Sequence, residues 1–208
     1  MTSSLRLLIA RHGESTGNVA GVVQGAGLES TLTQLGKEQA AKLRLRLECA
    51  EIDQVFSSDL PRAALTALLA LPGRRAELRA ELRERSAGVL EGQPLGAVEA
   101  AAAASRQRVR FFRPLGGESW ADVRERATRF LLQELLLDTE QQSRTVLVVS
   151  HGGFIRELVA AALALGASSL QLPRGRVGNT SLTTLLLLKT DGVWRCSELL
   201  WNDTDTHL

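Results

Sequence analysis

Two of the three histidines in this chain stand in matching sequence contexts. Arg11-His12-Gly13 follows the apolar run 5–10, and Ser150-His151-Gly152 follows the apolar run 145–149. Imidazole is a nucleophile and a proton carrier near neutral pH. A single histidine is more often structural than functional, but two at equivalent strand ends, each followed by glycine, indicate one shared site.

Two arginines supply the groups that a phosphate needs. Arg11 directly precedes the first of these histidines, and Arg62 stands where a second predicted strand gives way to a helix. A guanidinium group binds phosphate oxygens with paired N–H donors and stays charged at working pH. Taken alone, each arginine could equally be a solvent-exposed charge without a function. Together with the histidines, they predict a phosphate site.

Cleavage of a phosphate ester also requires an acid, and two glutamates are candidates. Glu84 lies in Leu82-Arg83-Glu84-Arg85, and Glu91 lies in Gly88-Val89-Leu90-Glu91-Gly92. Either carboxyl group could give a proton to the departing oxygen. Glu84 could equally form a surface ion pair with a neighbouring arginine. Spacing does not choose between the two glutamates.

Strands and helices alternate along the chain. The hydrophobic pattern predicts strands at 5–10, 55–57, 145–149, 181–188 and 193–200 and helices at 33–49, 61–72, 95–108, 119–137 and 154–165. Segment 76–82 fits either a strand or a helix. Thr33 is a helix cap, Ser119-x-x-Asp122 resembles a capping box, and Asp191-Gly192 predicts a hairpin turn.

This alternation predicts a three-layer α/β fold, with a mostly parallel central sheet covered by helices on both faces. Ligands of such sheets bind outside the carboxyl ends of the strands. His12 and His151 therefore share one crevice if their two strands are neighbours. A length of 208 residues predicts a single domain over residues 1–208.

Composition narrows the class of protein. The formal net charge of +2 is too balanced to indicate a nucleic-acid surface. Cys49 and Cys196 form no CxxC pattern, which argues against a zinc site or a dithiol centre. No signal peptide is recognisable before Arg11, and the apolar runs fall short of the ~20 residues of a membrane span. We therefore expect a cytoplasmic protein without membrane, nucleic-acid or metal partners.

Several blocks of the sequence resemble the histidine phosphatase, or phosphoglycerate-mutase-like, superfamily. They arrive in the order of that family and span nearly the whole chain. The blocks are Leu8-Ile9-Ala10-Arg11-His12-Gly13-Glu14-Ser15-Thr16-x-Asn18, Leu32-Thr33-x-x-Gly36, Phe56-Ser57-Ser58-Asp59-Leu60-x-Arg62-Ala63, Leu82-Arg83-Glu84-Arg85-x-x-Gly88-x-x-Glu91-Gly92, Gly116-Gly117-Glu118-Ser119 and Val148-Val149-Ser150-His151-Gly152.

The resemblance implies a role for each matching residue. His12 resembles the nucleophile that takes the phosphoryl group, and Glu84 resembles the proton donor. Arg11, Arg62 and His151 resemble the pocket that holds the phosphate oxygens. Asn18, Gln24, Gly25 and the Gly152 backbone resemble supporting substrate contacts. The resemblance implies no metal and no cofactor, and a small-molecule phosphate ester as substrate.

Within the superfamily, the chain favours a phosphatase over a phosphoglycerate mutase. It lacks the tryptophan-containing pattern that usually follows the first mutase motif, and only about 25 residues separate Gly92 from Gly116. The Gln24-Gly25-x-Gly27 segment and the closing Asp205-Thr206-His207-Leu208 resemble TIGAR-type fructose-2,6-bisphosphatases. A shorter broad-specificity phosphatase would share most of these motifs.

Two further alternatives remain. One is a cofactor-dependent phosphoglycerate mutase, and the other is a catalytically weak protein that only binds a phospho-ligand. The arginine-rich segment containing Arg106, Arg108, Arg110 and Arg113 favours a solvated basic face over a second phosphate site.

Overall fold

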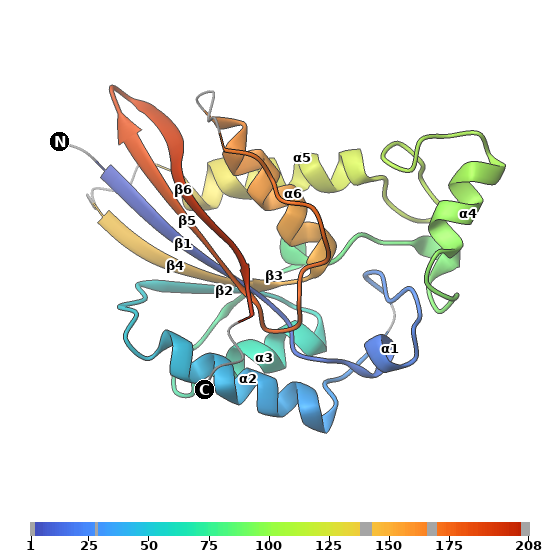
Figure 1. Cartoon of the computed structure of the whole chain (residues 1–208), viewed down its shortest axis with the longest axis horizontal. Coiled ribbons are helices and arrows are strands. Elements are labelled where there is room, and N and C mark those ends of the chain that lie inside the picture. The colour runs from blue at the N-terminus through green and yellow to red at the C-terminus, as the bar shows by residue number, and fades with distance from the viewer. Residues whose placement is uncertain (1–2, 28, 138–142, 166–169, 205–208) are drawn as a thin grey trace.

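The computed structural model describes residues 3–27, 29–137, 143–165 and 170–204 (Figure 1). The tail resemblance at Asp205–Leu208 lies outside these residues. The strands are β1 (Ser3–Arg11), β2 (Gln54–Ser58), β3 (Glu77–Arg79), β4 (Ser143–Ser150), β5 (Leu182–Thr190) and β6 (Val193–Asp203). The α-helices are α1 (Thr16–Val19), α2 (Gln34–Leu47), α3 (Pro61–Ala70), α4 (Ala97–Ala104), α5 (Trp120–Phe130) and α6 (Gly152–Leu163).

In the described part of the chain, the six strands form one sheet in the order β3-β2-β4-β1-β5-β6. β3, β2, β4 and β1 run parallel, and β5 and β6 add an antiparallel edge. β1 and β4 are direct neighbours, and Arg11 pairs with Ser150 where both strands end. The predicted mostly parallel sheet is confirmed, and so is the condition that brings His12 and His151 to one edge.

Alternation along the strands gives the sheet two apolar faces. Leu7 and Ile9 of β1 join the core under α5 and α6, whereas Leu8 and Ala10 join the core under α2 and α3. Figure 1 shows these two helix pairs on opposite sides of the sheet. A strand that is apolar at every position must be covered on both faces. The predicted three-layer arrangement is confirmed.

Capping residues set several helix starts. Thr33 accepts a hydrogen bond from the Gly36 amide, and Ser119 with Asp122 forms a complete capping box, both as predicted. The predicted hairpin turn is also confirmed, since Asp191 and Gly192 have φ angles of 52° and 77° between β5 and β6.

Other boundaries differ from the predictions. The helix predicted over 119–137 is regular only to Phe130 and continues as a wider π-helical turn at Leu131–Leu135. The helix predicted over 95–108 covers only Ala97–Ala104. The undecided segment 76–82 contains both types, with β3 followed by a 3₁₀ turn at Ala80–Leu82. Leu35, in the first turn of α2, is exposed.

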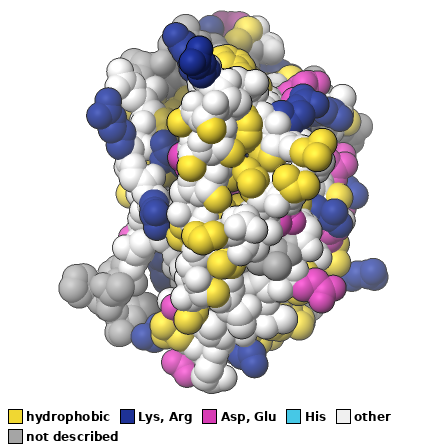
Figure 2. Space-filling view, turned by 90° about the vertical axis from the view of Figure 1, so that its right-hand side faces the viewer, with side chains coloured by type: hydrophobic (Ala, Val, Ile, Leu, Met, Phe, Trp, Pro, Cys, Tyr) yellow, Lys and Arg dark blue, Asp and Glu magenta, His cyan; other side chains and the backbone are white. Residues whose placement is uncertain are grey.

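α4 lies away from the sheet, at the end of the molecule that faces the viewer in Figure 2. Hydrophobic side chains gather over the middle of this face, and most basic side chains lie near its margins. Segment 88–115 contributes Val89, Leu95, Phe111 and Leu115 to the exposed large hydrophobic residues. No helix in the described residues is long and apolar enough to cross a membrane.

Candidate active site

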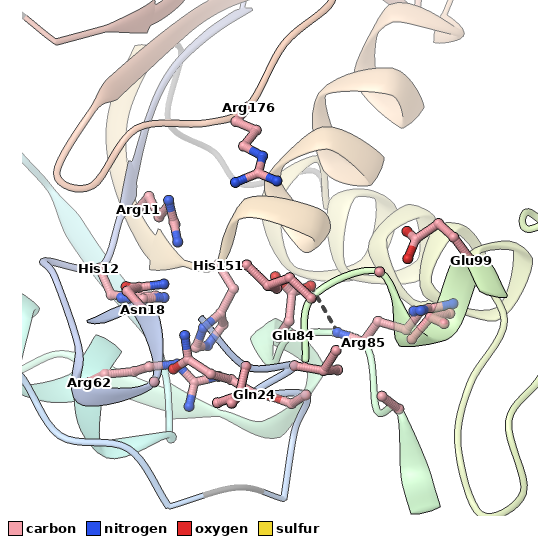
Figure 3. A pocket seen from close by; sticks show the side chains of 18 of the residues that line it. Arg11, His12, Asn18, Gln24, Arg62, Glu84, Arg85, Glu99, His151 and Arg176 are labelled. Atoms are coloured by element: carbon pink, nitrogen blue, oxygen red, sulfur yellow. Dashed lines mark hydrogen bonds between the residues drawn. The ribbon is translucent and has the colours of Figure 1, made fainter. Parts of the chain in front are cut away.

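The two histidines meet at the carboxyl ends of β1 and β4. The His12 amide donates to the Ser150 carbonyl oxygen, which fixes the two strand ends side by side. The ring centroids of His12 and His151 are 5.1 Å apart, and both side chains are buried. The matching sequence contexts therefore correspond to one site, which Figure 3 shows from close by.

Hydrogen bonding leaves one nitrogen of His12 available for attack. Nδ1 lies 2.7 Å from the Gly13 carbonyl oxygen. A carbonyl oxygen can only accept, so Nδ1 carries the proton and Nε2 keeps its lone pair. Burial, and then the charges of Arg11 and Arg62, hold the pKa of His12 well below its ordinary value. At neutral pH the imidazole is uncharged, which is the form that acts as a nucleophile.

Arg11 and Arg62 present unused donors to the pocket. Arg11 donates from Nη1 to the Val177 carbonyl oxygen, and Arg62 donates from Nη2 to the Gly25 carbonyl oxygen. Nε of Arg11 and both Nε and Nη1 of Arg62 are buried without a hydrogen-bond partner. Burial is the main cause that lowers the pKa of Arg62 to about 10, so it remains charged at neutral pH. Buried donors of this kind fit an anion with several oxygens.

His151 faces the same space from β4. Its Nε2 lies 2.9 Å from the Ser58 hydroxyl oxygen, while its Nδ1 is buried without a partner. Burial and the neighbouring charges, with Arg62 foremost, hold the pKa of His151 well below its ordinary value. His151 is therefore a neutral, fixed side chain with one ring nitrogen free to contact a phosphate oxygen.

The structure separates the two candidate acids. Glu84 lines the pocket, and its carboxylate oxygens accept from the amides of Arg85 and Gly153. Glu91 accepts from the amides of Ala26, Gly27 and Ala87 and has no place in the pocket lining. Glu84 is thus placed for proton transfer, and Glu91 ties two loops together.

The four predicted binding residues have different positions. Asn18, Gln24 and Gly25 line the pocket. Asn18 also closes a capping box with Ser15 at the start of α1. Gly152 begins α6 beside the Arg11 side chain and is not among the residues that line the pocket. Its role as a substrate contact stays a prediction.

Comparison with known proteins identifies the family. The family model of the histidine phosphatase superfamily (branch 1) matches residues 7–204. The chain belongs to the histidine phosphatase superfamily. The mouse fructose-2,6-bisphosphatase TIGAR is 29% identical over 196 residues, which cover 90% of this chain and 73% of TIGAR. The glucosyl-3-phosphoglycerate phosphatase of Mycolicibacterium vanbaalenii is 33% identical over 189 residues, which cover 86% and 83% of the two chains.

A solved structure extends the likeness to the fold. A mycobacterial glucosyl-3-phosphoglycerate phosphatase in complex with VO3 superposes with a TM-score of 0.76 at 31% identity, covering 96% of this chain and 99% of the other. The predicted family and phosphoglycerate-mutase-like fold are confirmed. This histidine phosphatase is an enzyme of the phosphatase class, and its substrates are phosphate esters.

The histidine phosphatase pocket also contains residues that the sequence analysis missed. The cavity has a volume of about 470 Å³. Beyond Arg11, His12, Arg62 and His151, the outer part of the lining is part apolar and part charged: Val22, Val23, Ala87, Leu95, Val98, Arg85, Glu99, Trp120 and Arg176. They come from loops and from the starts of α4 and α5, where no strand or helix period marks which side chains face inward. Arg85 had one available signal, since it directly follows Glu84.

Arg85 is the buried cation of this outer part. It is 6% exposed, its guanidinium carbon lies 4.4 Å from the centroid of the Trp120 ring, and its Nη1 has no hydrogen-bond partner. Arg83 points elsewhere and binds Asp59. The alternative in which Glu84 forms a surface ion pair with an adjacent arginine is therefore wrong for this histidine phosphatase.

Two loops that line the outer pocket are joined backbone to backbone. Val23 donates to Gln93 and accepts from Gly92, and Leu95 donates to Gly21. Val22 and Pro94 form an isolated β-bridge. We call these segments, residues 21–23 and 92–95, the outer ladder. The outer ladder places Val22, Val23 and Leu95 together in the lining of the pocket.

The arginines of segment 106–113 do not line this pocket. Arg110 pairs with Glu157 of α6, and Arg113 pairs with Asp122 of α5. Arg106 and Arg108 are exposed. This arrangement agrees with the predicted basic surface rather than with a second phosphate site.

Proposed function

We propose that this chain is a metal-independent, cytoplasmic phosphatase that hydrolyses a small phosphorylated metabolite through a phosphohistidine at His12. In this proposal residues 1–208 form one catalytic domain. The observation that carries the proposal is the neutral His12, with Nε2 free, among buried guanidinium and imidazole nitrogens that have no partner. That arrangement suits a nucleophile beside a phosphate-binding pocket.

In the first step, the phosphate oxygens occupy the unused donors of Arg11 and Arg62. Nε2 of His12 attacks phosphorus, the P–N bond forms and the bond to the leaving oxygen breaks. Glu84 gives its proton to that oxygen, so an alcohol leaves. The guanidinium groups stabilise charge on the equatorial oxygens throughout the transfer.

In the second step, Glu84 acts in the opposite direction. Its carboxylate takes a proton from a water molecule, and the water oxygen attacks phosphorus from the side that the alcohol left. The P–N bond breaks, phosphate is released, and His12 and protonated Glu84 are restored. One carboxyl group thus serves as acid and then as base.

The outer pocket supports a sugar phosphate or bisphosphate, such as fructose 2,6-bisphosphate, as the substrate. The apolar outer ladder suits the carbon side of a sugar. Arg85 and Arg176, at different positions around Glu84 (Figure 3), suit a second anionic group on the leaving alcohol. The matched relatives named for sugar-derived phosphates agree with this choice.

Phosphate release from a substrate panel tests the function. The panel pairs sugar monophosphates with bisphosphates and adds phosphoglycerates and nucleotides, without added metal. We expect hydrolysis by the wild type and a loss of about 10³-fold or more in His12→Ala, because no other residue replaces the nucleophile. Retention of more than a few per cent of the wild-type rate in His12→Ala would sink the phosphohistidine. Transfer between phosphoglycerates without net release would indicate a mutase.

The role of Glu84 is tested separately by the leaving group. Glu84→Gln cannot donate a proton, so we expect hydrolysis of a sugar phosphate to fall ~10²-fold or more. For para-nitrophenyl phosphate, kcat/KM should fall much less, because it reports only the steps up to release of a leaving group that needs little protonation. An equal fall in kcat/KM for both substrates would argue against a proton donor at this position.

A further inference from the structure

Glu84 lies on backbone that has no regular secondary structure. The 3₁₀ turn Ala80–Leu82 ends before it, and a second 3₁₀ turn, Gly88–Leu90, begins after it. A proton donor must lie within hydrogen-bond reach of the leaving oxygen, and a shift of ~1 Å can cost ~10²-fold in rate. Other parts of the chain must therefore hold this segment.

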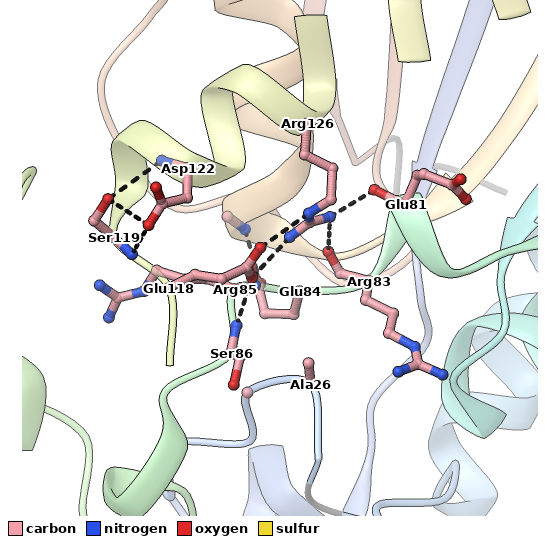
Figure 4. A network of polar contacts seen from close by, with 12 residues as sticks. Ala26, Glu81, Arg83, Glu84, Arg85, Ser86, Glu118, Ser119, Asp122 and Arg126 are labelled. Carbon is pink, nitrogen blue, oxygen red and sulfur yellow. Dashed lines mark hydrogen bonds and ion pairs between the residues drawn. The ribbon is translucent and has the colours of Figure 1, made fainter. Parts of the chain in front are cut away.

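Arg126 of α5 holds the backbone that precedes Glu84. Its Nη1 donates to the carbonyl oxygens of Glu81 and Arg83, at 2.5 and 2.9 Å (Figure 4). The Arg126 side chain is 15% exposed. Its guanidinium carbon also lies 5.2 Å from the centroid of the Phe154 ring on α6.

Glu118 holds the backbone that follows Glu84. Its Oε2 accepts from the Ser86 amide at 2.9 Å, and the Ser86 carbonyl oxygen accepts from the Glu118 amide. Both oxygens of Glu118 also accept from Arg126, from Nε at 3.1 Å and from Nη2 at 3.0 Å. One bidentate ion pair thus bonds to the chain on both sides of the acid.

We propose that the Arg126–Glu118 ion pair is a positioning device for Glu84 that sets the efficiency of proton transfer to the leaving group. It acts through the backbone of residues 81–86 and touches neither phosphate nor leaving oxygen. This inference rests on the proposed function of Glu84. It also assigns a role to Glu118 in the Gly116-Gly117-Glu118-Ser119 block, which takes no part in the proposed chemistry at His12.

The same pair connects the acid to the phosphate end of the pocket. Phe154, which lies against Arg126, follows Gly153 on α6, and the Gly153 amide donates to Oε2 of Glu84. His151 directly precedes this helix. Arg126 therefore contacts both the acid's backbone and the helix that starts at the phosphate-binding histidine, so the pair fixes the spacing between them.

The test compares leaving groups in Arg126→Lys and Glu118→Gln. A lysine ammonium keeps the charge but cannot reach two carbonyl oxygens and two carboxylate oxygens with a planar fork. Glutamine keeps an oxygen for the Ser86 amide but loses the ion pair. We expect kcat/KM, which reports the steps up to release of the leaving group, to fall at least ~10-fold for a sugar phosphate and to stay within ~3-fold of wild type for para-nitrophenyl phosphate.

Arg129→Lys is the matched control. Arg129 lies on the same helix in an exposed pair with Glu125, at 3.8 Å, and should change neither rate. The diagnostic quantity is kcat/KM for the sugar phosphate divided by kcat/KM for para-nitrophenyl phosphate. A fall in this ratio for Arg126→Lys or Glu118→Gln supports the proposal. Equal losses on both substrates, or no loss on either, overturn it.

A second measurement separates this inference from the proposed function. Amide hydrogen exchange at residues 83–87 should be faster in both variants than in wild type or Arg129→Lys, whether or not the chain hydrolyses the chosen esters. If wild type shows no His12-dependent hydrolysis, the proposed function fails, and amide hydrogen exchange still tests whether the Arg126–Glu118 ion pair holds this backbone. Unchanged exchange rates at residues 83–87 in the variants would overturn the proposed positioning role of the ion pair. If Arg126→Lys does not fold, Glu118→Gln decides both measurements.

Discussion

Gly153 lies against the Glu84 carboxyl group and leaves no room there for a side chain. A Cβ added at Gly153 would lie 2.4 Å from Oε1 of Glu84 and 2.4 Å from the Trp120 ring. At the preceding Gly152, the nearest atom would be 3.6 Å away, which is ordinary contact. Two adjacent glycines at the start of α6 therefore have different tolerance for a methyl group.

This difference leads to a prediction. Gly153→Ala should displace the Glu84 carboxyl and slow cleavage of a sugar phosphate ~10-fold or more, with a smaller effect on para-nitrophenyl phosphate. Gly152→Ala should have the smaller effect on the sugar phosphate. The values of kcat/KM for both variants on both substrates make the comparison. A larger loss in Gly152→Ala would contradict the contacts described here.

The positions of the proposed catalytic side chains could be predicted where these residues follow buried strands. His12, Arg11 and His151 could be placed because parallel strands end at one edge of the sheet. Glu84 and Glu91 could not be distinguished from their spacing, since both lie in irregular backbone: Glu84 between two 3₁₀ turns and Glu91 directly after the second. Only the family resemblance favoured Glu84. Arg85 and Trp120 were missed because their contact joins parts of the chain 35 positions apart.

Contact between α2 and the loop after β1 shows how an element positions His12, the proposed nucleophile. A Cβ at Gly36 would lie 2.0 Å from the Glu14 carbonyl oxygen, and a Cβ at Gly13 would lie 2.4 Å from the Gly36 carbonyl oxygen. The Gly13 amide also donates to Thr66 of α3. Helices on one face of the sheet thus hold the backbone that follows His12.

We therefore expect Gly36→Ala to be damaging although it improves helix propensity. The added methyl group must push α2 from the loop, at a cost of about 1–3 kcal/mol in unfolding free energy. A shift of His12 should lower turnover of every substrate alike, unlike changes near Glu84. Lys37→Ala, on the exposed side of α2, is the control. Denaturant unfolding and turnover measure the two effects, and wild-type values for Gly36→Ala would refute the prediction.

Hydrophobic periodicity located the main strands and helices but not all their ends. Some helices end where contacts with distant parts of the chain determine the backbone conformation, as in the π-helical turn after Phe130. There the carbonyl oxygens of Glu134 and Leu135 accept from Arg144, at the start of β4. No pattern within segment 119–137 reports that partner. Asp191-Gly192 was predictable because its turn depends only on local backbone geometry.

Folding buries the imidazole rings of His12 and His151 beside the charged side chains of Arg11 and Arg62. The unfolded chain takes up protons on His12 and His151 near pH 6.5. In the folded chain burial holds the pKa of each well below that value. Below pH 6.5 the unfolded state therefore binds more protons than the folded state, and stability falls as the pH falls.

The expected loss from these two residues is up to ~1.4 kcal/mol per pH unit for each histidine, between about pH 6.5 and the folded pKa values. Chemical denaturation at pH 7.5, 6.5 and 5.5, in phosphate-free buffer, measures it. His12→Ala should show a shallower dependence on pH than wild type over this range. Identical slopes would mean that His12 is not a buried neutral group.

The outer ladder has a consequence for how new specificities arise in this scaffold. Val22, Val23 and Leu95 belong to two segments that share backbone hydrogen bonds, whereas His12 and His151 follow strands of the central sheet. Recombination that exchanges one segment alone would leave its hydrogen-bonding partner mismatched. A change of substrate by loop exchange therefore requires residues 21–27 and 88–99 to be replaced together. The residues around His12 and His151 can stay the same.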